Sequence, residues 1–339
     1  MTKKQQIGVI MNTIFFLILF CVSTIATDLS TCSGINRAFV FVKPNAMNPE
    51  AIELVRRKLR EFKIDIVSEG SIDAATIDSN LLIDNHYGAI ASKAIGKAPY
   101  DISESAAELF ATTFKEDYSE VLAHGRVLNA KEACTRLGID HYQLGDKWAS
   151  LERGVSLVKF GGGFYCGRLD DIYVINGFYM AMRASYVTPP AAVRWMTVEW
   201  QPKETGLTWA AFRSDVVGAT DPSVAASTSI RAAILNQWRS LGLSNAPSVK
   251  ENGFHASASP FEALLERMNW LKLGDFTNDP FGKELYNAGV SAANIKLWGE
   301  DPQVDETWGR GNLFDILEDL DIENCISTLM NLQKSSPLS

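Results

Sequence analysis

The residues best suited to chemistry in this 339-residue chain lie around His255, one of only four histidines. Its surroundings read NGFHASASPFEALLERMNWL, and an amphipathic helix is predicted from Ser259, because serine is a favourable N-cap and Pro260 suits the first helical position. Glu262 could complete a capping box. A helix N-terminus attracts anions through its dipole and its unpaired N–H groups. An imidazole placed there is a candidate nucleophile for a phosphoryl group.

Glu266 follows His255 by eleven residues, so the predicted helix could bring its carboxylate beneath the ring. A carboxylate on one ring nitrogen fixes the tautomer and supports the charge of a phosphorylated imidazole. The alternative interpretation is that His255 only satisfies local backbone groups, which is the more common situation for a lone histidine.

Two further segments have the composition of anion-binding sites. The loop GATDPSVAASTSIR, from Gly218 to Arg231, combines small residues, an Asp-Pro turn and a terminal arginine. Lys43 stands in VKPNA, where a predicted strand passes into a turn. Taken separately, each segment is better explained as a solvated charge or an ordinary turn.

Taken together, the three segments resemble the nucleoside diphosphate kinase family. That family carries KPD-like residues at its first strand end, a G-x-T-[ND]-P … R loop, and N-x-x-H-[GA]-S-x-S followed by a helical glutamate. The counterparts here are VKPNA, GATDPSVAASTSIR, and NGFHASAS with Glu266, in the same order and with matching internal spacings. His86 and Tyr87 correspond to the family's His-Tyr pair. The resemblance covers residues 37–95 and 192–271.

The resemblance implies a ping-pong phosphotransferase in which His255 takes the γ-phosphate of a nucleoside triphosphate such as ATP and passes it to a nucleoside diphosphate. Glu266 would hydrogen-bond the other ring nitrogen. Mg²⁺ would arrive bridging the phosphates of the nucleotide rather than in a protein cage. The remaining implied contacts to phosphate, sugar or the glutamate come from Lys43, Tyr87, Arg213, Thr220, Arg231, Asn252 and Ser257.

The sequence departs from the family pattern at several of these positions. Asn45 and Ala258 stand where aspartates are usual, and Ile95 replaces the aromatic residue expected to stack on the base. The arginine expected four residues before the Gly218 loop falls on Ser214, while Arg213 is one position away. These changes affect binding of the base more than phosphoryl chemistry. They leave open a second hypothesis, a nucleotide-binding or scaffolding protein with weak or no turnover.

The resemblance, together with the predicted strands and helices, implies an α+β fold, a ferredoxin-like four-stranded antiparallel sheet with helices on one face. The family-like core would comprise residues 37–95 and 192–271, interrupted by an α+β insert at 96–191 and followed by an extension at 272–339. Strands are predicted at 38–43, 64–72 and 193–200, helices from Pro49 and over 74–85, 103–114, 130–137 and 208–216, and a hairpin within 171–187 that turns at Asn176-Gly177.

The glycine-rich stretch KFGGGFYCG, at 159–167, is a weak candidate for a phosphate cradle. It lacks the Lys-[Ser/Thr] ending and the following helix of a P-loop, which favours a tight strand junction instead. Cys166 within it has no evident base that would activate a thiol nucleophile. The five cysteines are scattered and contain no C-x-x-C pair, so free buried thiols are expected.

The overall composition is that of a globular protein, with 46% hydrophobic and 21% charged residues. A formal net charge of −8 argues against a nucleic-acid-coating surface. Residues 1–36 combine Lys3 and Lys4 with an apolar stretch and a small-residue zone, which predicts a signal peptide and a secreted or luminal protein. An uncleaved membrane anchor is the alternative. The absence of any N-x-S/T glycosylation acceptor points away from the secretory pathway. The family often forms homo-oligomers, which the insert could block.

Overall fold

The computed structural model describes residues 32–96, 101–161, 163–304 and 311–335. Most of the predicted signal peptide or anchor, residues 1–31, therefore lies outside the described residues. Across the described ranges, no helix combines the length and the apolar character that crossing a bilayer requires.

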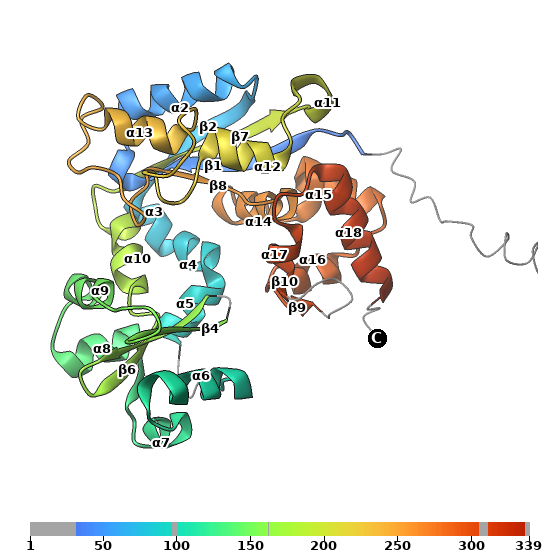
Figure 1. Cartoon of the computed structure of the whole chain (residues 1–339). Helices are drawn as coiled ribbons and strands as arrows, with labels where there is room; N and C mark the ends of the chain where they lie inside the picture. Colours follow the sequence, from blue (N-terminus) through green and yellow to red (C-terminus); the bar gives the residue numbers. More distant parts are fainter. Residues whose placement is uncertain (1–31, 97–100, 162, 305–310, 336–339) are drawn as a thin grey trace, which may run out of the picture.

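A four-stranded sheet with the strand order β2-β7-β1-β8 lies in the upper part of the view in Figure 1. Each of its three neighbouring pairs is antiparallel. Numbered within this sheet alone, the order is 2-3-1-4, which is the ferredoxin-like arrangement predicted from the sequence. The strands are β1 (Asn36–Val42), β2 (Asp65–Asp73), β7 (Ala192–Trp200) and β8 (Phe254–Ala256).

Helices cover both faces of this sheet, not one face as expected. Ala38, Val40 and Val42 of β1 pack into the cluster that includes the apolar side of α2 and α13. Phe39 and Phe41 point to the opposite face, against α3, α4 and the end of α14. The reason is visible in the strand AFVFV itself: it is apolar at every position, and a strand without polar alternation must be buried on both sides.

The helices of the core are mostly those that the sequence predicts, with one break. The predicted helix at 74–85 is interrupted around Leu81, which has a left-handed φ of 52°. The helical segments of the core are η2 (Pro44–Ala46), α2 (Pro49–Glu61), α3 (Ala74–Ser79), α4 (Leu82–His86), α5 (Gly88–Ile95), α11 (Pro202–Thr205), α12 (Trp209–Ala211), η3 (Phe212–Val217), α13 (Ile230–Gln237) and α14 (Pro260–Trp270).

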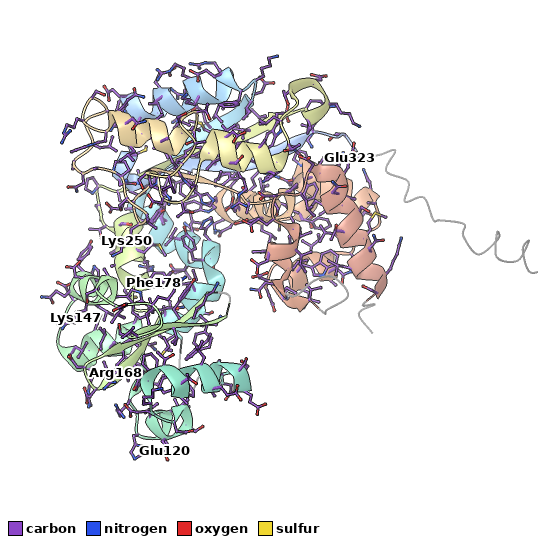
Figure 2. The ribbon with its side chains drawn as sticks, viewed as in Figure 1. Glu120, Lys147, Arg168, Phe178, Lys250 and Glu323 are labelled. Carbon is purple, nitrogen blue, oxygen red and sulfur yellow. The ribbon has the colours of Figure 1, made fainter. Side chains whose placement is uncertain are left out.

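The segment between α5 and β7 contains a second four-stranded sheet, with the order β3-β6-β5-β4. The glycine-rich stretch is the junction of β4 and β5, as the strand-junction interpretation predicted. Exposed Glu120, Lys147 and Arg168 mark the outer surface of this region (Figure 2). Its elements are α6 (Glu104–Phe114), α7 (Tyr118–Ala123), β3 (Val127–Asn129), α8 (Ala130–Leu137), α9 (His141–Ala149), β4 (Leu157–Gly161), β5 (Phe164–Leu169), β6 (Ile172–Ile175) and α10 (Tyr179–Val187).

The predicted hairpin turning at Asn176-Gly177 is wrong. β6 ends just before Asn176 and the chain continues as the helix α10. Tyr179 and Arg183 stand four residues apart on that helix, and both bind the buried carboxylate of Asp84 in α4, at 2.6 and 2.8 Å. The helix therefore ties the insert to the core immediately before His86 and Tyr87.

The C-terminal extension packs against α14 and has its own apolar cluster. Its anchor is a buried ion pair between Arg267 of α14 and Asp279, at 2.5 Å, and the Asp279 side chain also caps α15. The elements are η4 (Phe276–Asn278), α15 (Pro280–Asn287), α16 (Ala292–Trp298), β9 (Gln303–Val304), β10 (Gly311–Asn312), α17 (Leu313–Leu317) and α18 (Ile322–Ser335). Of the described cysteines, Cys32, Cys134, Cys166 and Cys325 are all free thiols.

Candidate functional site

His255 lies on the edge strand β8, directly opposite Phe41 of β1. The two rings stack with centroids 4.5 Å apart and planes 23° apart, so the phenyl ring limits the rotation of the imidazole. Gly253, two residues earlier, has a φ of +81°, and a Cβ there would approach Ile234 to 3.1 Å. The Asn-Gly turn thus delivers the chain to β8 in a conformation that favours glycine.

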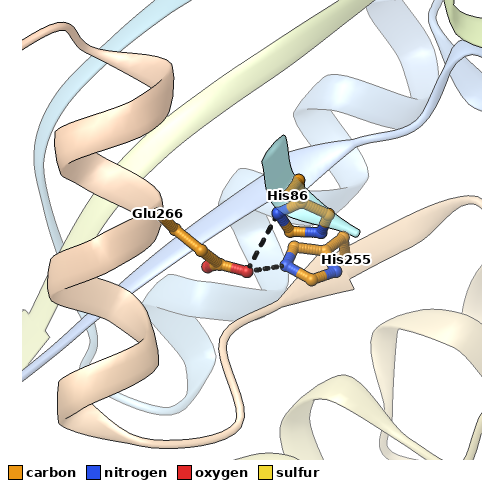
Figure 3. A group of neighbouring side chains, drawn as sticks. All are labelled: His86, His255 and Glu266. Carbon is orange, nitrogen blue, oxygen red and sulfur yellow. Dashed lines mark hydrogen bonds and ion pairs between the residues drawn. The ribbon is translucent and has the colours of Figure 1, made fainter. Parts of the chain in front are cut away.

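The hydrogen bond expected between His255 and Glu266 is present. Nε2 of the ring lies 2.7 Å from Oε1 of Glu266, which rises from α14 (Figure 3). Buried Ser257 donates to the second carboxylate oxygen at 2.5 Å and also contacts the backbone N–H and carbonyl of Phe39. Within the described residues no hydrogen-bond partner is found for Nδ1 of His255. One ring nitrogen is held, and the other keeps its lone pair for an electrophile.

A second imidazole joins this pair, which the sequence analysis did not foresee. Nδ1 of His86 lies 3.4 Å from Oε1 of Glu266, and the rings of His86 and His255 are 4.6 Å apart. Trp270 donates its indole N–H to the same Nδ1 at 3.3 Å. The only sequence signal was the His-Tyr pair itself, because the approach of α4 to α14 is a tertiary contact.

The three ligand atoms of His86, His255 and Glu266 lie within 4.8 Å of one another, close enough to suggest a metal centre. Two imidazoles with one carboxylate suit zinc or a related transition ion, not Mg²⁺, which prefers oxygen ligands. The carboxylate oxygen is already engaged by His255. The cluster therefore has no fit to the magnesium of a nucleotide complex.

Burial determines the protonation of this group. It lowers the pKa of His86 to about 3 and holds the pKa of His255 well below its ordinary value, helped by the charges of Lys43, Arg231 and Arg213. Burial also raises the pKa of Glu266. The contact of Glu266 with His255 is therefore a hydrogen bond to a neutral ring near pH 7, not an ion pair, and the neutral ring of His86 lies beside the carboxylate as a close neighbour. A neutral imidazole is the nucleophilic form.

Lys43 and Arg231 place positive charge near this ring, and of the two only Lys43 feels the charge of a carboxylate, that of Glu251. No carboxylate of the described residues forms an ion pair with either of them. Burial and the nearby guanidinium of Arg231 lower the pKa of Lys43 to about 8, and burial lowers the pKa of Arg231 to about 10. Arg231 is held by the carbonyls of Gly218 and Phe254, at 2.8 and 3.0 Å. Two buried cations, one of which lowers the pKa of the other, form a site that favours an anion.

Asn252 offers an unsatisfied polar atom beside this region. The side chain is 1% exposed, its amide N–H donates to the carbonyl of Thr220 at 3.1 Å, and its Oδ1 is buried with no hydrogen-bond partner among the described residues. A buried acceptor left unpaired is costly, and a ligand hydroxyl would satisfy it. Thr220 is exposed on the loop. The charges of Glu266 and Glu262 lie close to the Tyr87 hydroxyl, whose pKa is raised to about 12, first by burial and then by those charges.

Arg213 approaches the same ring despite its shifted position in the sequence. The segment Phe212–Val217 is a π-helix, and the N–H of Gly218 donates to the carbonyl of Arg213 five residues earlier, at 2.9 Å. A π turn accommodates one residue more than an α turn, which offsets the one-residue displacement noted in the sequence. Its charge reaches both His255 and Arg231, since it lowers the pKa of each. However, the guanidinium is paired with Glu318 and with Asp319.

The capping box predicted at Ser259 is only half formed. Ser259 accepts from the N–H of Glu262 at 3.1 Å, but the Glu262 carboxylate accepts from the N–H of Ala258 at 2.9 Å. Burial and the nearby Glu266 raise the pKa of Glu262. The start of α14 is therefore filled by its own glutamate, and the cations provide the better anion site.

Comparisons with known proteins do not assign the chain to a family. No family model matches the chain, and no curated protein matches it. Among solved structures, the nucleoside diphosphate kinase of Encephalitozoon cuniculi is 14% identical with a TM-score of 0.34, covering 72% of this chain and 92% of that one. The NDP kinase of Pyrobaculum aerophilum is 16% identical with a TM-score of 0.33, covering 70% and 95%.

A third solved structure is a transition-state mimic of the Borrelia burgdorferi nucleoside-diphosphate kinase with bound vanadate and ADP. It is 14% identical with a TM-score of 0.31, covering 70% of this chain and 86% of that one. Values this low assign no family. The ferredoxin-like fold rests on the strand order of the sheet, and the roles of the individual residues stay predictions.

Proposed function

We propose that the protein is a nucleoside diphosphate kinase that works through a phosphohistidine at His255. One observation carries the proposal. A neutral imidazole has one nitrogen fixed by Glu266 and the other without a partner among the described residues, beside two buried cations that form no ion pair within those residues. Phosphoryl transfer needs little more than a positioned nucleophile and compensation of the phosphate charge.

In the first half-reaction, the Nδ1 lone pair attacks the γ-phosphorus of a nucleoside triphosphate. The bond from that phosphorus to the bridging oxygen breaks, and the nucleoside diphosphate leaves with its electron pair. In the second, a terminal oxygen of another diphosphate attacks the same phosphorus and the P–N bond breaks. Nε2 keeps its proton throughout, held by Glu266, so no proton has to enter or leave the site.

The surrounding residues have separate tasks in this scheme. Lys43 and Arg231 compensate the charge of the transferring group, and Tyr87 offers a hydroxyl at the same place. Asn252 accepts a hydrogen bond from a ribose hydroxyl through its unpaired Oδ1, and Thr220 contacts the nucleotide from the exposed loop. Mg²⁺ arrives with the nucleotide and compensates its phosphate charge, because the histidine-rich cluster offers it no oxygen cage.

The second candidate function is nucleotide binding with weak or no turnover. The observation that favours it is the pairing of Arg213 with Glu318 and Asp319, which removes one cation from the phosphate site. The intact hydrogen bond between His255 and Glu266 favours the kinase instead. Entry into the secretory pathway and assembly into homo-oligomers remain proposals that rest on residues 1–36 and on the resemblance.

The decisive experiment is labelling with γ-³²P-ATP and Mg²⁺. The protein should acquire one acid-labile, base-stable label, lose it on addition of GDP with formation of GTP, and show none in the His255→Ala variant. His124→Ala is a matched control, because this histidine is exposed at the end of α7, in the insert and distant in sequence from His255. A folded wild-type protein that binds ADP but takes no label would favour the binding function, and one that does neither would overturn both.

A further inference from the structure

A short segment of the C-terminal extension, residues 318–322, lies against the core beside the π-helix. The N–H of Asp319 donates to the carbonyl of Ala258 at 3.0 Å. Asp321 accepts from the N–H of Trp209 at 2.7 Å and from the side chain of Asn36 at 2.6 Å. These three hydrogen bonds hold the segment close to the end of β8, which carries His255, and to the start of α12.

The first two side chains of the segment bind Arg213. Nη1 of Arg213 contacts Oε1 of Glu318 and lies 2.9 Å from Oδ1 of Asp319. The two carboxylate side chains are 43% and 45% exposed, and that of Arg213 is 32% exposed. The carboxylates are therefore not structural core groups. They sit at the rim, where solvent and a ligand can reach them.

The charge of Arg213 belongs to the same cationic group as Arg231, as its effect on the pKa of that residue and of His255 shows. Two carboxylates on one guanidinium change the local charge from +1 to −1. Lys43 and Arg231 have no such partners in the described residues. The extension thus neutralises one selected cation of the site and leaves the other two available.

We propose that Glu318 and Asp319 act as an internal competitor for nucleotide phosphates, an autoinhibitory latch that occupies Arg213 until a polyphosphate displaces it. Carboxylate oxygens and phosphate oxygens both accept the N–H groups of a guanidinium, so one excludes the other at the same donors. This inference rests on the proposed function, because it assigns regulation to the same phosphate site.

The test is nucleotide affinity after removal of the latch charges. Glu318→Gln/Asp319→Asn should bind MgADP about threefold to tenfold more tightly than wild type in isothermal titration, because two partly exposed ion pairs no longer compete. Inorganic tripolyphosphate is the second probe, and the variant should bind it more tightly than wild type by the same factor. Glu323→Gln is the matched control, since Glu323 belongs to the same extension but pairs at 2.9 Å with exposed Lys203 (Figure 2).

A double-mutant cycle separates the latch from a general change in net charge. In an Arg213→Gln background, the double substitution should no longer alter the affinity. Equal or weaker binding of both probes by the latch variant, with the wild type still labelled at His255, would overturn the latch alone. Failure of wild type and variants alike to bind either probe would overturn the phosphate site and the latch together. Because the altered side chains are half-exposed, melting temperatures close to wild type are expected.

Discussion

The substitution Glu266→Gln tests the part of the site on which the chemistry depends. It keeps the size of the side chain and removes its charge. In the variant, the amide oxygen can face Nε2 of His255, and the amide N–H can donate to Ser257. The Ser257 hydroxyl can then donate to the carbonyl of Phe39, which already lies 2.9 Å away. All hydrogen bonds and the ring tautomer are retained, so the substitution isolates the charge.

The magnitude follows from that isolation. A hydrogen bond to a charged group contributes about 1.5–3 kcal/mol, and each 1.36 kcal/mol of barrier corresponds to roughly a tenfold change in rate. The imidazole ring develops positive charge only when Nδ1 bonds to phosphorus. Removal of the Glu266 charge therefore destabilises the transition state more than the ground state. We expect phosphorylation of His255 to slow by about tenfold to a hundredfold, with little change in MgADP affinity.

Rapid-quench measurement of label transfer from γ-³²P-ATP, at saturating nucleotide, gives this rate directly. Glu199→Gln is a suitable control, because it removes the charge of a partly exposed glutamate on β7 that pairs with Arg37 of β1. Thermal melting of both variants should stay near wild type, since the buried Glu266 carboxylate is costly to ionise, as its raised pKa shows. Phosphorylation at the wild-type rate in Glu266→Gln would refute the reasoning.

Two further predictions concern pH. Because burial lowers the pKa of Lys43 to about 8, and only the charged amine attracts phosphate, MgADP affinity should fall by about tenfold per pH unit above that value. Lys43→Gln should bind more weakly at pH 7 and lack this decline in titration calorimetry, so a parallel decline in the variant would contradict the assignment. Burial raises the pKa of Glu262 from 4.5 to about 8, which means that the folded state keeps a proton that the unfolded chain loses. The stability contributed by this group is complete below about pH 4.5 and is lost as pH rises toward 8. The urea midpoint of Glu262→Gln should therefore rise relative to that of the wild type between pH 5 and pH 8.5. A constant difference between the two proteins would show that the carboxyl is not buried in its protonated form.

The local sequence determined much of the surroundings of His255. Strand, turn, capping serine and helix are all short-range features, so the eleven-residue spacing from His255 to Glu266 was enough to predict their contact. The all-apolar strand at Phe39 and Phe41 likewise required burial on both faces, although the sequence analysis expected helices on one face only. The prediction of a hairpin at Asn176-Gly177 was wrong because this turn connects a strand to a helix. The residue that the helix contacts, Asp84, is distant in sequence, so local spacing does not reveal it.

Only the tertiary structure decided which distant groups meet at the ring. The approach of His86 depends on α4 packing against α14, and the position of Arg213 depends on a π turn that spacing alone does not reveal. The pairing of that arginine with Glu318 and Asp319 joins residues more than a hundred positions apart. Residue type and local spacing fix what a side chain can do, whereas burial, which sets its pKa, and its charged neighbours arise only when separate segments pack together.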